Sequence, residues 1–203
     1  MAHEHHDHDH SSTPLRALLI ALGITGTVFF AELIGGWLAG SMALMADAMH
    51  MLFDAAGLII AVLAVLVGRR QASAQATYGY RRVEVLAALA NAVMVLAIPV
   101  WIVVEAVRRL QSPAEVQGKT MLIIAVIGLV ANALSAWVLH RHRKSSINVE
   151  GAFLHVLVDM LGSVAVIVAG IVVLTTGFVA ADVIASLAIA AMVLPRAWQL
   201  MRL

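Results

Sequence analysis

Residues 50–54 read HMLFD, and residues 155–159 repeat the pattern as HVLVD; each stretch lies inside a long apolar run. Both continue as His-x-Leu-x-Asp-x-x-Gly, ending at Gly57 and Gly162. A four-residue spacing places imidazole and carboxylate on one face of a helix, about 5–6 Å apart at Cβ. Ionisable side chains are costly at bilayer depth, so two copies of this pair predict a functional site.

The composition is that of a membrane protein. Of the 203 residues, 62% are hydrophobic and only 12% are charged, with a mean hydropathy of +0.96. A soluble domain carries about 25% charged residues. The chain has no cysteine, which excludes disulfides and thiolate ligands, and its net charge of +1 argues against a nucleic-acid partner. We expect neither an enzyme nor an organic cofactor.

Six apolar runs predict an all-α polytopic protein with six transmembrane helices. Each run has about 20 residues or more, enough to cross a hydrocarbon core of roughly 30 Å. We expect a His-rich, disordered segment at 1–13 and a six-helix transmembrane domain at 14–203. The predicted spans are 15–38, 42–67, 83–110, 120–140, 148–175 and 179–200.

The basic residues predict the orientation of these helices. With the N-terminus in the cytoplasm, Arg108, Arg109 and Lys119 lie outside, and the other ten of the 13 Lys and Arg residues lie inside. We therefore expect both termini in the cytoplasm of a bacterium and the helices in its inner membrane. The two motifs then lie on antiparallel helices of a 3+3 inverted-repeat-like arrangement, in which transporters place their substrate near the midplane.

Four side chains, His50, Asp54, His155 and Asp159, form the candidate metal site. Two imidazoles and two carboxylates suit tetrahedral Zn²⁺, and the two negative charges balance a divalent cation. Their ligand type does not exclude Co²⁺, Ni²⁺, Cd²⁺ or Fe²⁺. The same groups bind protons, so metal and protons compete for one set of atoms, as antiport requires.

The sequence gives weaker evidence of a functional role for three other acidic residues. Asp47 shares a helical stripe with His50 and Asp54, and periodicity alone does not decide which of the three bind metal. The second repeat has Ala152 where the first has Asp47, so we expect Asp47 to support the ligands or line the pathway. Two further acids, Glu32 and Asp182, either line a water-filled path or form interhelical hydrogen bonds.

Five histidines near the N-terminus alternate with acidic residues. They are either a weak metal-collecting arm or a dispensable tail or purification tag. These residues are His3, His5, His6, His8 and His10.

Three stretches carry a resemblance to a known family. They are SMALMADAMHMLFD at 41–54, YGYRRVEVLAALAN at 78–91 and NVEGAFLHVLVDMLGS at 148–163. Together they resemble the zinc-transporting branch of the cation diffusion facilitator family. The resemblance implies a homodimer of six-helix subunits that exports zinc from the cytoplasm in exchange for protons. It also implies that the two His/Asp pairs form the intramembrane site, and a His at position 50 is typical of zinc or zinc/cadmium transporters.

The chain departs from the family pattern at its end. Members of the family usually continue into a cytoplasmic metal-binding domain that helps them dimerise, whereas this sequence stops at Leu203, just beyond the sixth predicted helix. We therefore expect no such domain here and a dimer that depends on membrane contacts.

Three alternatives to a proton-coupled zinc exporter stay open at this point. The same residues could form the selectivity site of a passive divalent-cation channel, or a structural zinc site that joins two helices. They could also serve an exporter of Fe²⁺, Mn²⁺, Co²⁺ or Ni²⁺, although two imidazoles favour zinc.

Overall fold

The computed structural model of the protein describes residues 12–68, 81–143 and 147–201. Six α-helices occupy these ranges, which confirms the all-α prediction, and their ends fall within three residues of the predicted ones. The helices are α1 (Ser12–Ala39), α2 (Met42–Gly68), α3 (Arg81–Gln111), α4 (Gly118–His140), α5 (Ile147–Thr176) and α6 (Ala180–Met201).

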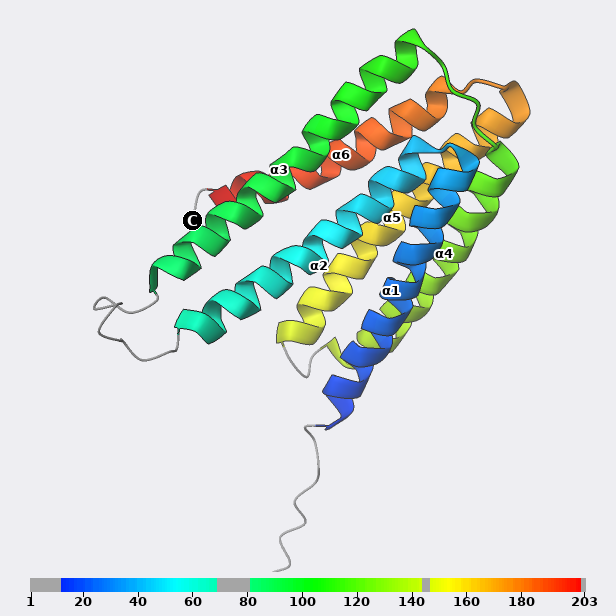
Figure 1. Cartoon of the computed structure of the whole chain (residues 1–203). Helices are drawn as coiled ribbons and strands as arrows, with labels where there is room; N and C mark the ends of the chain where they lie inside the picture. Colours follow the sequence, from blue (N-terminus) through cyan, green and yellow to red (C-terminus); the bar gives the residue numbers. More distant parts are fainter. Residues whose placement is uncertain (1–11, 69–80, 144–146, 202–203) are drawn as a thin grey trace, which may run out of the picture.

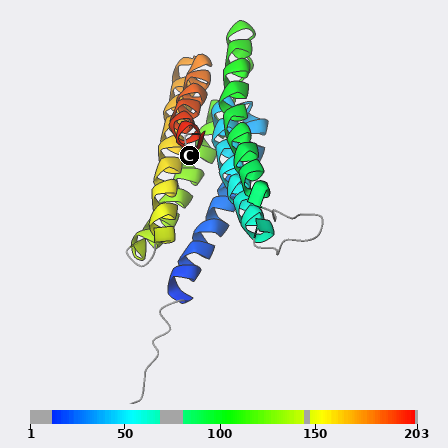
Figure 2. The ribbon, with the colours of Figure 1, turned by 90° about the vertical axis from the view of Figure 1, so that its left-hand side faces the viewer.

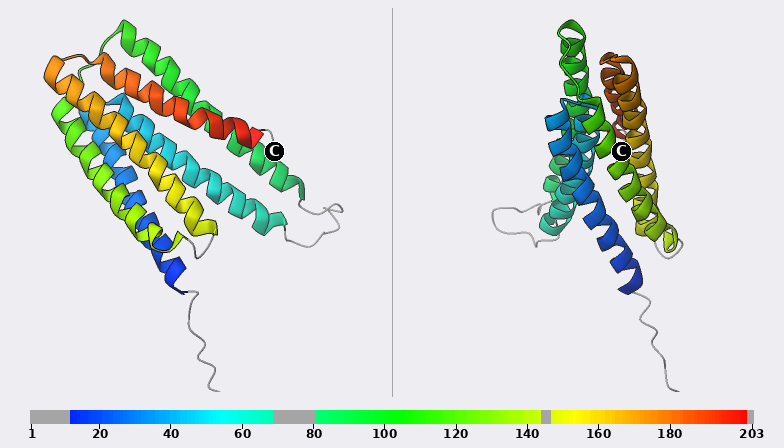
Figure 3. Two further views of the ribbon diagram at one scale, coloured as in Figure 1. Left: turned by 180° about the vertical axis from the view of Figure 1, so that it is seen from behind. Right: turned by 90° about the vertical axis from the view of Figure 1, so that its right-hand side faces the viewer.

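The helices alternate in direction along one elongated bundle (Figure 1). Helix α4 packs against both α1 and α5, and α3 pairs with α6 along one side of the bundle (Figures 1 and 2). Seen from behind, α2 and α5 are antiparallel neighbours, because α2 begins at the end of the bundle where α5 finishes (Figure 3). The two motif-bearing helices therefore have the relative direction that the sequence predicts.

Among the residues that the structure describes, three helical segments are long and apolar enough to cross a membrane: Arg16–Ala39, Gly118–His140 and Asn148–Thr176. They expose many large apolar side chains, among them Leu22, Trp37, Leu134 and Leu154. A soluble protein rarely exposes so much contiguous apolar surface, so these faces fit a lipid environment. These observations indicate an integral membrane protein.

The first half of α2 forms the centre of the bundle. From Ser41 to Met51, every residue is buried or half-buried, on all sides of the helix. Small residues such as Ala43, Ala46 and Ala48 let neighbouring helices approach closely, because their side chains fill little space. The segment that carries His50 is thus the most enclosed stretch of the chain that the structure describes.

A tight turn connects α1 to this central helix. The backbone N–H of Ser41 donates to the carbonyl of Gly36 at 2.9 Å, and that of Gly40 to Trp37 at 3.3 Å, which is the Schellman pattern of a helix C-terminus. Gly40 has a φ of +65°, and a Cβ there would lie 2.6 Å from the backbone oxygen of Glu115. Only glycine meets both conditions at this position.

Asp182, the third residue of α6, caps the N-terminus of α2. Its carboxylate accepts hydrogen bonds from the backbone N–H groups of Met42 at 2.7 Å and Ala43 at 3.1 Å, and from the Ser41 hydroxyl at 2.6 Å. The Ser41 oxygen in turn accepts from the N–H of Leu44 at 3.2 Å. Asp182 is fully buried, so these bonds satisfy donors that water does not reach.

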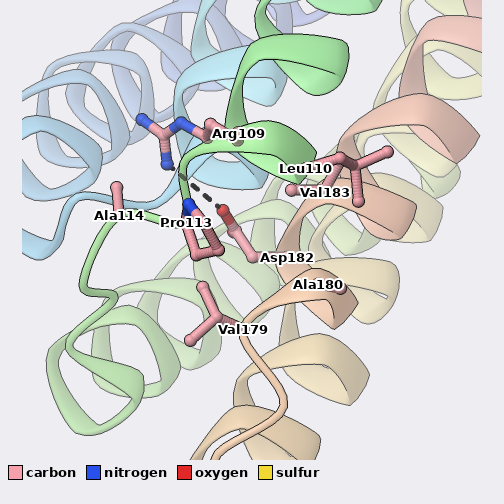
Figure 4. Close-up of a pocket in the computed structure, with 8 residues that line it drawn as sticks. All are labelled: Arg109, Leu110, Pro113, Ala114, Val179, Ala180, Asp182 and Val183. Carbon is pink, nitrogen blue, oxygen red and sulfur yellow. Dashed lines mark ion pairs between the residues drawn. The ribbon is translucent and has the colours of Figure 1, made fainter.

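Arg109 of α3 completes the network at this end of the bundle. Its Nη1 donates to the carbonyl of Gly40 at 2.6 Å and lies 3.8 Å from Asp182 Oδ2, while its Nε donates to Glu105 Oε1 at 3.2 Å. Arg109 and Asp182 also line a small pocket of about 90 Å³ between α3 and α6 (Figure 4). We call this end of the bundle, defined by Gly40, Arg109 and Asp182, the capped end.

We predict that Asp182→Ala destabilises the protein by about 2 kcal/mol or more, because it leaves buried N–H donors and the Arg109 guanidinium without their acceptor. Unfolding of the purified protein in detergent micelles measures this loss. Glu115→Ala is the matched control, since it removes an exposed acid at the same end and should change stability by less than about 0.5 kcal/mol. Equal stability of the two variants would contradict the capping role.

Candidate metal centre

The side chains of His50 and Asp54 on α2 converge with those of His155 and Asp159 on α5. His50 Nε2 lies 3.7 Å from Asp54 Oδ2 and 3.9 Å from Asp159 Oδ1. On the other side, His155 Nδ1 lies 3.5 Å from Asp54 Oδ2, and its Nε2 lies 3.8 Å from Asp159 Oδ2. The two imidazole rings are 6.0 Å apart at their centroids. The four predicted residues therefore form one alternating ring of imidazoles and carboxylates.

The ring is slightly wider than a bound metal ion requires. Bonds of about 2.0–2.2 Å around tetrahedral zinc place neighbouring ligand atoms about 3.3–3.6 Å apart. Three of the four separations, at 3.7–3.9 Å, exceed this by a few tenths of an ångström, and the fourth, at 3.5 Å, lies within it. No three potential ligands in the described ranges are close enough to hold a metal ion as they stand.

His155 has a choice of ligand atom. Its two ring nitrogens face different carboxylates, Nδ1 towards Asp54 and Nε2 towards Asp159. An imidazole binds one ion through one nitrogen, and the other nitrogen then holds the ring by a hydrogen bond. The arrangement can thus supply both a ligand and the carboxylate that orients it.

Burial divides the four residues into two pairs. The His50 and Asp159 side chains are 5% and 1% exposed, whereas those of Asp54 and His155 are 29% and 31% exposed. Along their helices, Asp54 and His155 are the members further from the capped end. The site is therefore closed towards the capped end and more accessible from the opposite end.

Asp47 contacts α5 at a different place from the four residues. It is buried, and its carboxylate lies against Gly162, where a Cβ would come within 2.5 Å of Asp47 Oδ1. Asp159 lies one turn before Gly162 on the same helix, so Asp47 is close to the four residues. The last glycine of the second motif thus makes room for an acid that lies three residues before the first motif, a relationship that helical periodicity could not indicate.

The two other predicted acids lie in separate surroundings. Glu32 of α1 is buried, with its carboxylate against Gly128 of α4. Asp182 is the helix cap at the capped end, where hydrogen bonds to Ser41, Met42 and Ala43 engage both of its oxygens. Its contacts are those of a structural group, and the prediction that it lines a pathway has no support from them.

The five N-terminal histidines (His3, His5, His6, His8 and His10) lie outside the described residues. The prediction that they collect metal stays a prediction.

Comparison with known proteins identifies the family. Residues 18–202 match the model of the cation efflux transmembrane domain. The chain is 48% identical over 188 residues to the zinc transporter ZitB of Yersinia pestis, covering 92% of this chain and 60% of that protein. It is 42% identical over 197 residues to the metal cation efflux system protein CzcD of Cupriavidus metallidurans, covering 97% and 62% of the two chains.

A third relative is named as an antiporter. The chain is 40% identical over 192 residues to the cadmium, cobalt and zinc/H(+)-K(+) antiporter of Bacillus velezensis, covering 93% of this chain and 61% of that one. The chain thus spans about three fifths of the length of these relatives. The match to the family model extends over most of the chain, from the first helix to the last. The resemblance read from the sequence is confirmed, and the chain belongs to the cation efflux family.

Proposed function

We propose that this chain moves Zn²⁺, and Cd²⁺ where present, out of the cytoplasm in exchange for protons. The observation that carries the proposal is the convergence of two imidazoles and two carboxylates from α2 and α5 at 3.5–3.9 Å. The names of the relatives support the substrate class, and that of the Bacillus velezensis protein supports protons as the coupled ion.

In this proposal, all six helices span the inner membrane as a 3+3 inverted repeat with both termini in the cytoplasm. The capped end then faces away from the cytoplasm, because α1 runs from the N-terminal side to Gly40. The protein forms a homodimer through its membrane helices. Residues 1–13 precede the transmembrane domain and act as an accessory metal-collecting arm.

The four residues would hold the cargo ion as a neutral unit. Two aspartates supply two negative charges, which balance a divalent cation and remove most of the cost of placing it among apolar helices. Imidazole nitrogens favour Zn²⁺ and Cd²⁺ over Mg²⁺ and Ca²⁺, which prefer more oxygen ligands. The four side chains already converge at 3.5–3.9 Å, so the ligand atoms are near their places before the ion arrives.

Protons would replace the metal at the same atoms. Once the ion leaves, two carboxylates and two imidazoles lie close together, and protons are the smallest cations that relieve their mutual repulsion and desolvation. Metal binding in turn releases those protons, because a ligand atom must be deprotonated to bind. This competition couples the two fluxes without any other group.

The distribution of burial supports loading from the cytoplasm in this conformation. Asp54 and His155 are the accessible pair and lie away from the capped end, while His50 and Asp159 are enclosed. Release on the other side requires α2 and α5 to separate towards the capped end. A site shared by two helices permits this, because each helix keeps its own pair of ligands.

We predict that Asp54→Ala and Asp159→Ala each lower zinc flux by more than about tenfold, since each removes a ligand and one balancing charge. Flux of zinc into proteoliposomes containing a fluorescent indicator measures the effect. Glu150→Ala is the matched control, because it removes an exposed acid from the same helix as Asp159. If both site variants transport as the control does, the assignment is wrong.

A pH gradient separates the antiporter from a channel. In inside-out vesicles with an acidic lumen, we expect zinc to accumulate in the lumen above the external concentration, because protons leaving the lumen drive it. A protonophore should abolish the accumulation. Zinc that equilibrates across the membrane regardless of the gradient would instead indicate a passive channel.

Removal of residues 1–10 tests the accessory arm. We expect a modest change in apparent zinc affinity or rate, smaller than that caused by Asp159→Ala, because weak exchangeable ligands raise the local metal concentration without forming the path. The same vesicle assay applies. Complete loss of transport would show that the arm is essential and not accessory.

A further inference from the structure

A second group of buried polar side chains lies beside the metal site, mostly on its capped-end side. Glu32 of α1, Asp47 of α2, Asn132 of α4 and Ser163 of α5 are 1%, 2%, 1% and 0% exposed. The four come from the helices that surround the centre of the bundle, which Figure 3 shows side by side. We refer to these four residues as the carboxylate cradle.

Within the described part of the chain, both carboxylate oxygens of Glu32, the Asn132 side-chain oxygen and the Ser163 hydroxyl lack a hydrogen-bond partner. Buried polar groups in folded proteins are nearly always paired, and an unpaired buried carboxylate is especially unfavourable. Three side chains with unpaired oxygen atoms in one region therefore point to a bound cation, which such oxygens can coordinate.

Two glycines provide the space for the carboxylates. A Cβ at Gly128 would lie 2.6 Å from Glu32 Oε1, and a Cβ at Gly162 would lie 2.5 Å from Asp47 Oδ1. Each carboxylate thus occupies the notch that a glycine leaves in the facing helix. Any larger residue at either position would push the acid out of its place.

The helix register places three of the cradle residues at about one level, and Asn132 one turn further from the capped end. A Cβ at Gly170 of α5 would lie 3.5–3.6 Å from the backbone and Cβ of Leu122 on the antiparallel helix α4, so the two helices are close together there. Counting back along α5 and forward along α4 from this contact places Ser163 beside Gly128, the residue that faces Glu32. Asn132 is one turn from Gly128 on the same buried face of α4.

The charges also lie within reach of one another. Glu32 interacts electrostatically with Asp47 and with Asp159, and Asp47 interacts with Asp159. Asp159 belongs to the main site, so the cradle and the main site are neighbours. Ionised carboxylates that are close together in a low-dielectric interior repel one another, and either a bound cation or protons relieve the repulsion.

We propose that the carboxylate cradle is a second cation site, which binds a divalent metal ion beside the main site, towards the capped end. The proposal rests on the proposed function, because it gives the cradle a place on the path of the exported ion. Glu32 and Asp47 balance the two charges of the ion, and Asn132 and Ser163 supply neutral oxygens.

An all-oxygen cradle binds zinc more weakly than the main site, which has two imidazoles. Carboxylate, amide and hydroxyl oxygens favour harder ions such as Mn²⁺, whereas imidazole favours zinc. A weak site after a tight one suits release, since an ion on a path must bind well enough to enter and loosely enough to leave.

Metal binding to the full chain in nanodiscs tests the cradle. One equivalent of Zn²⁺ first fills the main site, and Mn²⁺ is then titrated and followed by its electron paramagnetic resonance signal. We expect one further, weaker Mn²⁺ site in the wild type. Glu32→Gln should weaken that site by about 10- to 100-fold while the tight zinc site keeps its affinity.

Glu150→Gln is the control, because it removes an exposed acid outside the cradle and should retain both sites. Unchanged Mn²⁺ binding in Glu32→Gln would overturn the cradle while leaving the main site intact. A wild type without tight zinc binding would instead overturn the proposed function. If Glu32→Gln loses tight zinc binding as well, Asn132→Ala decides: loss of the weak site alone supports the cradle, and unchanged Mn²⁺ binding rejects it.

Discussion

The N-terminus of α2 is the point on which the rest of the bundle depends. This helix starts in the buried centre of the protein, where its first N–H groups have no water to bind. The carboxylate of Asp182 satisfies them from α6, and Arg109 joins the same network from α3. Because helices are stiff, fixing the first turn of α2 also fixes His50 and Asp54, which lie two to three turns further along it.

The bundle consequently has two ends of different character. At the capped end, hydrogen bonds and an ion pair tie the α1–α2 turn, α3 and α6 together. Away from it, the ligand pair Asp54 and His155 is partly exposed. The proposed exchange of metal and protons requires one side to be closed while the other is open, and the difference in burial between the two pairs is compatible with such a state. Rigidity at one end and access at the other are consequences of the same network.

The sequence predicted the helices and the pairing of His and Asp side chains on each of two helices, because both depend on local pattern. Apolar runs located the helix ends, and the spacing in HMLFD and HVLVD placed each pair on one face. It could not predict the partners of Asp182 or of Glu32, since those depend on contacts across the bundle. Ser41 before an apolar run is a recognisable helix cap, yet nothing local links it to an acid 141 residues away.

The two repeated segments share their His and Asp residues but differ at Asp47. The repeated His-x-x-x-Asp pairs give the two antiparallel helices the same pair of side chains at the point where they meet. Asp47 has no counterpart in the second repeat, where Ala152 takes its place. Asp47 lies on the capped-end side of the site, against Gly162, and Ala152 lies on the other side. The extra carboxylate therefore makes the two sides of the four-residue cluster chemically unequal, because only the capped-end side has this additional acid of α2.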